Sequence, residues 1–524
     1  MKINELIIKD LIKSKIKNQT DLAFFKRKIA KKYKIPIPSN IQLLQAYHEF
    51  LKQKRKGASE KIERILRTRP VRSLSGIVNI SILTKPYPCP GKCIFCPFEK
   101  DFPKSYVSGE PAAERAKRLK YNPYSQTKKR IESLEKEGHA TDKIELRIVG
   151  GTWSFYPKRY QTWFIKRCFE AANQRNSKNL KEAQKVNERA KNRIVGLSIE
   201  TRPDFINLKE IRRLRMLGVT MVELGVQSIF NEVLKVCKTG LTREKIIKAT
   251  KLLKDAGLKV LYQIMLNLPG SNINKDLSCL KTIFGNENFR PDWLKIYPCV
   301  VCKNTTLYLW WKRRKYKPYP NEKLINLLIE IKKDLPYWIR LTRLLRDIPS
   351  QKIVAGCKVS NLREVVESKM EEKNLRCKCI RCREIRENYD PKEKVYLFRE
   401  DYRASGGREI FLSFENKTRK KLLSYLRLRV PSFYFLKKQH FLKILDGATI
   451  IREIQTLGPQ VPISKRKIAP QHRGLGRKLI REAEKIAKEE FGLEKIAIIA
   501  GIGAREYFRK LGYKLRNTYM IKKI

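Results

Sequence analysis

Three closely spaced cysteines form the motif best suited to chemistry in this sequence. Cys89, Cys93 and Cys96 follow the spacing C-x3-C-x2-C, directly after the short β-branched run Ile77–Leu83. Three thiolates on one tight loop can hold three irons of a cubane iron–sulfur cluster and leave the fourth iron open. Disulfides would be strained at these separations, and zinc would need a distant fourth ligand. The motif predicts a reactive iron–sulfur site and a reducing compartment.

Small and polar residues follow three further β-branched runs, and each run precedes a helical pattern. In a parallel sheet the carboxyl ends of the strands meet at one edge, where ligands bind. A glycine backbone can approach such a ligand closely. The residues at these strand ends are Gly150, Gly151, Thr152, Glu200, Arg202 and Gln227. We expect them to lie beside the cysteines.

A second glycine pattern precedes the helical segment Arg477–Glu490. It reads Gln471-His-Arg-Gly474-Leu475-Gly476, in the form Q-x-x-G-x-G. Backbone N–H groups at a helix N-terminus can bind a pyrophosphate. The pattern, with the run Lys495–Ala500 and the segment Tyr507–Tyr513 after it, resembles the GNAT acetyltransferases, which implies coenzyme A as ligand.

Three more cysteines are separated by only a few residues. Cys377, Cys379 and Cys382 have the spacing C-x-C-x2-C, which predicts a structural zinc if a fourth ligand is present. Cys357, Cys302 and a histidine are the candidates for that ligand. An auxiliary iron–sulfur cluster and three uncoordinated thiols remain as alternatives. Cysteines in helical patterns are expected to be packing residues; these are Cys168, Cys237 and Cys279.

The expected fold class is α/β. Six β-branched runs alternate with amphipathic helical patterns between residues 71 and 310, which predicts a partial (βα)6 barrel. Hairpin-like runs and one helix after residue 393 predict a separate α+β domain. The expected units are a basic helical arm (1–70), the barrel (71–310), a basic connector with the second cysteine cluster (311–392) and the α+β domain (393–524).

The charge favours a polyanionic partner. The 524 residues include 116 Lys and Arg against 52 Asp and Glu, a net charge of +64. In residues 1–70 the counts are 19 and 6, a net +13, which favours an arm that binds phosphates over a merely solvated helical face. Charges interrupt the apolar residues of MKINELIIKDLIKSK, so we expect no signal peptide, and no apolar run reaches the length of a spanning helix. We therefore expect a cytoplasmic protein that does not bind membranes.

The combination of the two motifs resembles the Elongator catalytic subunit family, whose members join a radical S-adenosylmethionine (SAM) barrel to a GNAT domain. The resemblance runs from about residue 75 to the C-terminus and includes GEPAAERAKRLKYNPYSQT, GHATDKIELRIVGGT, ETRPD, ELGVQS, FRPDWLKIYP, RLLRDIPS and IIREIQTLG. It implies a tRNA wobble-uridine carboxymethylating enzyme. A deoxyadenosyl radical would take hydrogen from the methyl of acetyl-CoA, and the resulting carbon radical would add to C5 of uridine.

The resemblance also assigns roles to residues. Cys89, Cys93 and Cys96 correspond to ligands of a [4Fe-4S] cluster, and Gly150, Gly151, Thr152, Glu200, Arg202 and Gln227 would surround SAM. The residues implied at acetyl-CoA are Lys143, Glu453, Ile454, Gln455, Thr456, Gly474, Leu475, Gly476, Arg477, Tyr507 and Phe508. Lys143 and Tyr507 are also implied in catalysis. Phe508 stands where the family often has a second tyrosine, so ring packing is expected there.

Three other functions compete with this one. A protein lysine acetyltransferase would use the barrel only as a scaffold and would be active without SAM. A non-catalytic tRNA-binding subunit is expected to lack cluster ligands, and all three cysteines are present. A different radical-SAM RNA modifier, such as a methylthiolating enzyme, does not account for a complete GNAT domain. The expected partners are the tRNA anticodon stem-loop and a reductase or other electron donor; a homodimer is possible on sequence grounds alone.

Overall fold

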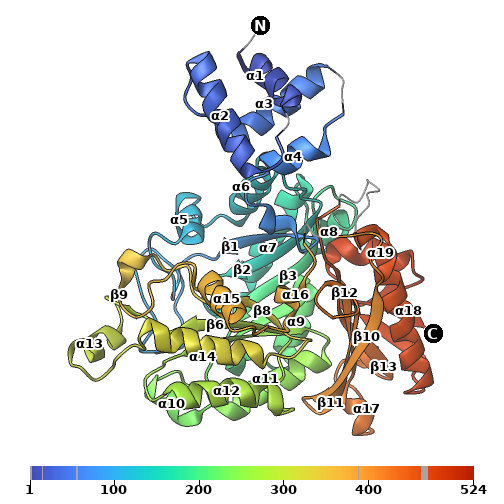
Figure 1. The fold of residues 1–524 in the computed structure, drawn as a ribbon. Helices are drawn as coiled ribbons and strands as arrows, with labels where there is room; N and C mark the ends of the chain where they lie inside the picture. Colours follow the sequence, from blue (N-terminus) through green and yellow to red (C-terminus); the bar gives the residue numbers. More distant parts are fainter. Residues whose placement is uncertain (1–2, 15, 55–56, 387–388, 462–469) are drawn as a thin grey trace.

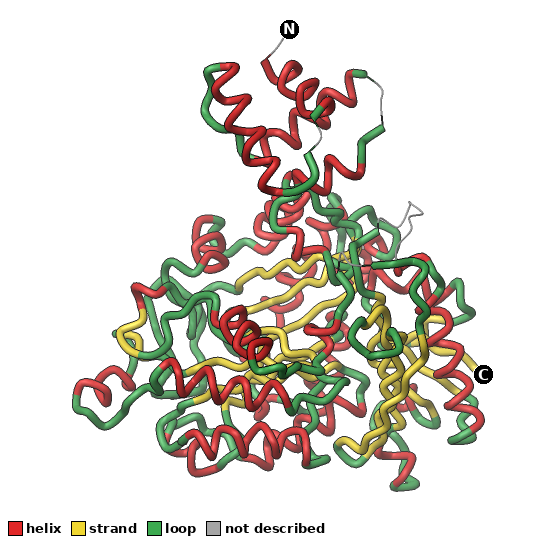
Figure 2. The backbone as a smooth tube through the Cα atoms, viewed as in Figure 1, coloured by secondary structure: helices red, strands yellow, loops and turns green. Residues whose placement is uncertain are grey.

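The chain forms three successive parts, shown in Figures 1 and 2: a helical bundle, a central sheet covered by helices, and a second sheet at the C-terminal end. The computed structural model describes residues 3–14, 16–54, 57–386, 389–461 and 470–524.

The central sheet has the order β1-β2-β3-β4-β5-β6-β8, and every neighbouring pair is parallel. Its strands are β1 (Val78–Leu83), β2 (Lys143–Val149), β3 (Arg193–Thr201), β4 (Met221–Gln227), β5 (Lys259–Leu266), β6 (Trp293–Pro298) and β8 (Arg340–Arg343). Because β1 and β8 are the two edges, the sheet is a half-barrel that is open along one side. Parallel order brings all carboxyl ends to one rim, where the first cysteine loop follows β1.

Helices connect these strands and cover the sheet. They are α5 (Pro111–Arg118), α6 (Pro123–Lys136), α7 (Lys158–Asn173), α8 (Leu180–Asn187), α9 (Leu208–Leu217), α10 (Asn231–Val236), α11 (Arg243–Asp255), α12 (Ile273–Gly285), α13 (Thr306–Lys312), α14 (Asn321–Lys333), α15 (Leu362–Glu372) and α16 (Ile380–Arg383). Asparagine begins several of them: the side chains of Asn179, Asn207 and Asn272 each accept a hydrogen bond from the backbone N–H three residues later.

The expected partial barrel is confirmed, and the structure adds a strand to it. All six predicted runs are strands, but β8, which lies in the segment expected to be a connector, pairs with β6 as a seventh. Its sequence RLTR has four residues with arginine at both ends, so it has no apolar run that could reveal it. Two further short strands pair beside the barrel, β7 (Val301–Cys302) and β9 (Ile353–Ala355).

The C-terminal sheet has the order β10-β11-β12-β13-β14-β16-β15. Its elements are β10 (Tyr396–Ala404), β11 (Gly407–Glu415), β12 (Leu422–Val430), α17 (Ser432–Phe435), β13 (Ala448–Thr456), α18 (Leu475–Glu489), β14 (Lys495–Ile498), α19 (Arg505–Arg509), β15 (Lys514–Arg516) and β16 (Tyr519–Lys523). The strands β13 and β14 run parallel and pair as far as Ile451 and Ile498. Beyond that pair β13 continues without β14, which opens a gap between them.

The N-terminal helices form a small bundle that stands apart from the barrel (Figure 1). They are α1 (Ile3–Lys13), α2 (Gln19–Tyr33), α3 (Asn40–Gln53) and α4 (Glu60–Leu66). Leu11, Leu43, Leu44 and Tyr47 belong to a core that this bundle does not share with the barrel. Pro36 and Pro38 lie between α2 and α3, where proline does not continue a helix.

Buried ion pairs join the barrel to the C-terminal sheet. Arg452 on β13 pairs with Asp292 just before β6, and Arg429 on β12 pairs with Asp255 at the end of α11. All four side chains are at most 1% exposed. Separating the two parts would leave uncompensated charges, which is strongly unfavourable in a protein interior. The barrel and the C-terminal sheet therefore form one rigid unit.

In the part of the chain that the structure describes, every helix is too short or too polar to span a lipid bilayer.

Candidate active site

The first cysteine loop lines a cavity of about 200 Å³ at the carboxyl ends of the barrel strands. Cys89, Cys93 and Cys96 lie at its wall. The Sγ of Cys89 is 3.4 Å from Oγ1 of Thr152, which follows β2. The loop therefore lies against the end of the neighbouring strand, as the order of the elements predicts.

The thiols of the first cysteine loop are spread too widely to hold a single metal ion. One tetrahedral zinc with Zn–S bonds near 2.3 Å would hold its sulfurs about 3.8 Å apart. Among the described residues, Cys89, Cys93 and Cys96 do not form a group with all ligand atoms within 4.8 Å. Burial raises the pKa of Cys93 to about 12. A cationic group is needed to hold the thiolate in this position.

Arg202, the residue after β3, lies beside the cysteine loop. Its guanidinium donates to Asp204 at 3.0 and 2.8 Å and to the Thr239 carbonyl at 2.9 Å. A Cβ on Gly91, inside the cysteine loop, would lie 2.6 Å from the Arg202 Nη1 atom. With glycine at that position, the loop can cross this arginine without displacing its guanidinium.

The other predicted residues reach the same cavity in most cases. Gly151, Thr152, Glu200, Arg202 and Gln227 line it. Gly150 lies behind it: its φ is +127°, and a Cβ there would lie 2.2 Å from the Thr84 Oγ1 atom. Gly150 therefore shapes the turn, and Gly151 provides the exposed backbone.

A polar network crosses the barrel interior below the cysteines. Glu223 on β4 pairs with Arg147 on β2 and with Lys295 on β6. Burial alone would raise the pKa of Glu223, but the two cations lower it to about 2. Glu200 joins the network, since it accepts hydrogen bonds from Tyr106 at 3.1 Å and from Gln263 at 3.0 Å. These groups fix charged side chains beneath the place where a ligand of the cysteine site would lie.

The second site lies where β13 separates from β14. A cavity of about 140 Å³ there is lined by Ile454 and Gln455 of β13 and by Phe508. Its opposite wall comes from the barrel and includes Glu145 and Trp293. The gap in the C-terminal sheet therefore faces the barrel.

Lys143 and Gln471 connect this site to the start of the barrel. The Lys143 Nζ atom donates to the Val461 carbonyl and to Oε1 of Gln471, both at 2.8 Å. Gln471 in turn donates from Nε2 to the Gly76 carbonyl at 2.9 Å. Burial lowers the pKa of Lys143. The residues that the resemblance places at acetyl-CoA are thus linked across both domains.

The glycine pattern precedes α18 as the sequence predicts. Gly474 precedes the helix with φ of +72°, and Leu475, Gly476 and Arg477 form its first turn. A Cβ on Gly476 would approach the Tyr507 hydroxyl at 3.3 Å and the Thr456 Oγ1 atom at 3.8 Å. The helix N-terminus therefore opens toward β13 and Tyr507, which is 44% exposed.

Two of the residues implied at acetyl-CoA have other contacts. The Glu453 carboxylate pairs with Arg427 at 2.8 Å and with Lys259 at 3.3 Å, so it belongs to the charged interface between the two domains. Phe508 is 4% exposed and packs in the core of the C-terminal domain. Ring packing is thus the contact that Phe508 makes here.

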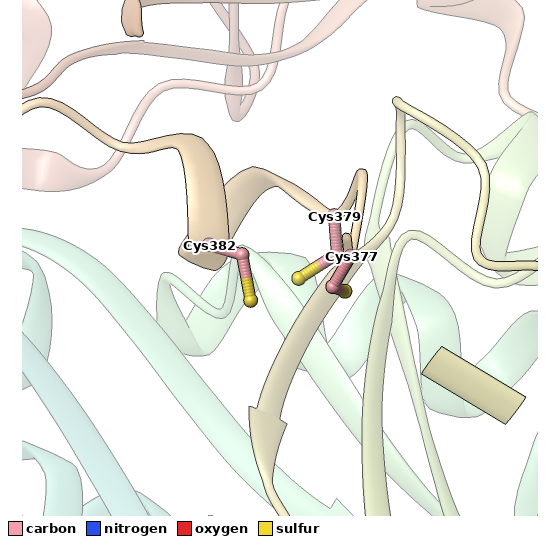
Figure 3. Close-up of side chains that lie close together, drawn as sticks. All are labelled: Cys377, Cys379 and Cys382. Carbon is pink, nitrogen blue, oxygen red and sulfur yellow. The ribbon is translucent and has the colours of Figure 1, made fainter. Parts of the chain in front are cut away.

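The second cysteine cluster converges on one point (Figure 3). The Sγ atoms of Cys377, Cys379 and Cys382 all lie within 4.8 Å of one another, which is close enough to hold one ion. Hydrogen bonds from the other two thiols lower the pKa of Cys379. The neighbouring polar group is the Glu367 carboxylate, 3.7 Å from the Cys382 Sγ atom. Cys302 lies elsewhere, in β7.

A cleft of about 480 Å³ runs along the open side of the half-barrel, between β1 and β8. Arginines dominate its wall: Arg72, Arg130, Arg147, Arg340, Arg343, Arg363 and Arg381. Burial, with Arg363 close by, lowers the pKa of Arg381 to about 10, and its Nε atom has no hydrogen-bond partner. A cleft of this charge suits an anionic ligand.

Comparison with known proteins agrees with this arrangement. The radical SAM superfamily matches residues 87–278, the Radical_SAM C-terminal domain residues 291–372 and the acetyltransferase (GNAT) family residues 469–513. A tRNA uridine(34) acetyltransferase of Methanocaldococcus infernus is 47% identical over 539 residues, which cover 100% of this chain and 98% of that protein. The chain belongs to the Elongator protein 3 family.

Other relatives extend the comparison. The Elongator complex protein 3 of Homo sapiens is 37% identical over 473 residues, which cover 87% of this chain and 86% of that protein. The solved structure of archaeal Methanocaldococcus infernus Elp3 with an N-terminal deletion (1–46) has a TM-score of 0.76 and 46% identity, over 86% of this chain and 100% of that one. The family and the fold class expected from the sequence are both confirmed.

The sequence motifs did not identify several residues of the active site in this member of the Elongator protein 3 family. Tyr106, Arg147, Glu223 and Arg346 line the cysteine cavity. For Arg147, which lies on a strand, the signal in the sequence is the period of two: Glu145, Arg147 and Val149 are alternate residues of β2. Tyr106 and Arg346 lie in loops, where no such pattern exists. When polar residues occupy alternate positions of an otherwise apolar strand, they indicate that the barrel interior is polar.

Proposed function

We propose that the protein modifies the wobble uridine of tRNA. The relatives named above are tRNA uridine(34) acetyltransferases and Elongator proteins, and the net charge of +64 suits a folded RNA. An anticodon loop offers an unpaired base that can be splayed into a pocket. The arginine cleft beside β1 and β8 leads from the surface to the cysteine cavity, since the two share Ser81, Arg147 and Arg343.

We infer that the product is a 5-carboxymethyl group derived from acetyl-CoA. A [4Fe-4S] cluster with SAM, when bound at the three cysteines, supplies a carbon-centred radical that can take a hydrogen atom from a methyl group. Glu200, Arg202 and Gln227 present charged and amide groups to the polar parts of SAM. After addition to C5, loss of the C5 proton and of one electron to a one-electron acceptor would restore the uracil ring, and thioester hydrolysis would leave the carboxylate.

The observation that carries this proposal is the direction in which the GNAT site opens. In the cavity between β13 and β14 the acyl group would meet Glu145 and Trp293 of the barrel, and not the surface of another protein. A protein lysine acetyltransferase needs the acyl group to be accessible to a lysine from outside. The geometry favours delivery of the acetyl group to the barrel.

The residues around the second site supply binding and orientation. The first turn of α18 presents free backbone N–H groups to the pyrophosphate of coenzyme A. Lys143 holds Gln471 and Val461 in place, and the Tyr507 hydroxyl lies over Gly476. A structural zinc at the second cysteine cluster would fix α16 against the barrel.

An anaerobic assay tests this function. Reconstituted protein is incubated with tRNA, dithionite, SAM and acetyl-CoA, and the nucleosides are analysed by mass spectrometry. A carboxymethyl mass on the wobble uridine is expected with the wild type and with Cys279→Ala, which removes a buried packing cysteine on α12. It is expected to be absent with Cys93→Ala. Acetylated protein lysines with unmodified tRNA would instead support the scaffold alternative.

A further inference from the structure

We propose that the acyl end of the thioester reaches the cysteine site through the inside of the half-barrel, along the inner faces of β1 and β2. We call this route the inner passage; Ile77, Asn79, Ser81, Glu145, Arg147 and Trp293 line it. The inference rests on the proposed function and specifies how its two sites cooperate.

The cavities themselves form a continuous series. The GNAT cavity and the arginine cleft share Ile77, Glu145, Trp293 and Gln455 in their walls. The cleft and the cysteine cavity share Ser81, Arg147, Arg343 and Asp347. The residues that two neighbouring cavities share come from several strands or loops. They therefore surround the junction between those two cavities.

The periodicity of the strands explains why the passage follows them. Glu145, Arg147 and Val149 are alternate residues of β2 and therefore point to one face of the sheet. Glu145 borders the GNAT cavity, Arg147 borders the cleft and the cysteine cavity, and Val149 borders only the cysteine cavity. At about 3.3 Å per residue this path is about 13 Å long. The flexible arm of coenzyme A that carries the acyl group can cover such a distance.

Because the interface between the two domains is rigid, the arm of coenzyme A that carries the acyl group has to move between the two sites. The sites lie at opposite ends of the barrel strands, Lys143 at the start of β2 and Thr152 after its end. The ion pairs Arg452–Asp292 and Arg429–Asp255 prevent the C-terminal domain from swinging across that distance. The acyl group must therefore travel while the domains stay in place.

The lining also suits the arm of an acyl thioester, which carries amides and no charge. Glu145 lines both the GNAT cavity and the arginine cleft, and its charge acts on Arg147 two residues along the same strand. Its carboxylate oxygens can accept a hydrogen bond from an amide N–H of the arm. Trp293 beside it offers an apolar surface.

Arg147 lies at the junction of the arginine cleft and the cysteine cavity. Its guanidinium reaches across from β2 to Glu223 on β4, with Nε 3.1 Å from Oε1. Both side chains lie between the arginine cleft and the cluster loop. An arm that arrives from the GNAT side must pass the Arg147–Glu223 pair to bring its methyl group to the cysteine cavity.

Photolabelling of the cluster-free full-length protein tests the route without any turnover. The probe is a coenzyme A thioester whose acyl group carries a diazirine. We expect cross-links on β1 and on β2, at Asn79 and Glu145, together with links on β13. Cross-links confined to β13, α18 and Tyr507 would overturn the inner passage.

A blocking variant tests it in the loaded enzyme. Asn79 is exposed to the cleft, so Asn79→Trp adds an indole to the passage without disturbing the core. Met216→Trp on the outer face of α9 is the matched control, since Met216 is 57% exposed and outside the three cavities described above. Both variants are first checked for unchanged coenzyme A binding.

Trideuteroacetyl-CoA then reports whether the methyl group arrives. One C–D bond of the acetyl group breaks and one forms in 5′-deoxyadenosine, with dithionite as the source of the electron. We expect deuterium in 5′-deoxyadenosine with the wild type and Met216→Trp, and about a 10²-fold loss with Asn79→Trp. Deuterium transfer at the wild-type rate in Asn79→Trp would overturn the passage, even if that variant no longer modified tRNA. Absence of the tRNA product in the wild type would instead overturn the proposed function.

Discussion

Arg452 and Asp292 form a bidentate ion pair in the interior between the two domains. Arg452 Nη1 is 2.9 Å from Oδ2 of Asp292, and Nη2 contacts Oδ1. The same carboxylate accepts from the Val260 backbone N–H at 2.8 Å, and Lys254 lies 3.2 Å away. The pair thus connects β13 of the GNAT domain with β5, β6 and α11 of the barrel.

Removal of the Asp292 charge is expected to destabilise the protein strongly. In Asp292→Asn the buried Arg452 and Lys254 lose one of their two counter-charges, since Glu409 remains 3.2 and 3.5 Å away, and we expect a cost of about 3 kcal/mol of unfolding free energy. The measurement is urea-induced unfolding followed by circular dichroism.

Glu489→Gln is the matched control for this prediction. Glu489 pairs with Lys485 on the surface of α18, and both are 61% exposed. The control is expected to change the unfolding free energy by less than about 1 kcal/mol. Equal effects of the two variants would show that the interface does not depend on the buried pair.

Lys143→Met is expected to weaken binding of coenzyme A. The variant loses both hydrogen bonds of Nζ and leaves Oε1 of Gln471 without that donor, at a cost of about 1–3 kcal/mol, or roughly 5- to 150-fold in Kd. Calorimetric titration with a non-hydrolysable acetyl-CoA analogue measures it. Lys129→Met, on the exposed face of α6, should bind as the wild type does. An unchanged Kd in Lys143→Met would remove Lys143 from the binding site.

The sequence predicts the elements of this fold well because most of them have strong periodicity. The run Ile77–Leu83 is β1 without its first residue, and the helical segment expected at Arg477–Glu490 is α18, which spans Leu475–Glu489. The strand β8 is missed because its side chains do not alternate in polarity. The residues that the active site takes from the ends of the strands can be predicted from the order of the elements along the chain. The Arg147–Glu223 pair cannot be, because it depends on the curvature that brings β2 opposite β4.

The second cysteine cluster is expected to hold one zinc ion per chain. Cys379→Ser should release it, as measured by elemental analysis of the purified protein, and should lower the unfolding temperature. Cys302→Ser should keep the zinc, because Cys302 is in β7 and outside the group of three thiols. Loss of zinc from both variants would mean that Cys302 is the fourth ligand, contrary to this geometry.

His139 is expected to make stability depend on pH between about 4 and 6.5. Burial lowers the pKa of His139 from 6.5 to about 4. The ring also makes hydrogen bonds with Ser73 and the Thr68 carbonyl, both at 2.9 Å, and the bond to Thr68 acts in the opposite direction on the pKa. The folded state binds fewer protons than the unfolded state in this range, so stability is complete above pH 6.5. It falls as pH drops toward 4, by at most about 3 kcal/mol.

His139→Gln tests this pH dependence. The variant keeps a hydrogen-bonding side chain but cannot titrate, so its unfolding free energy should vary less between pH 4 and 6.5 than that of the wild type. Glu137, Arg67 and Arg72 also face His139 and remain in both proteins. Parallel pH profiles for the two proteins would assign the pH dependence to other groups.

Deletion of residues 1–70 is expected to weaken tRNA binding strongly and to leave cluster assembly intact. Residues 1–70 carry a net charge of +13, and the four helices within them have a core of their own. Fewer phosphate contacts should also reduce the slope of log K against log salt. Filter binding at several salt concentrations measures the affinity, and the absorbance of the reconstituted protein reports the cluster. The same affinity and slope in the truncated protein would place the tRNA contacts on the arginine cleft alone.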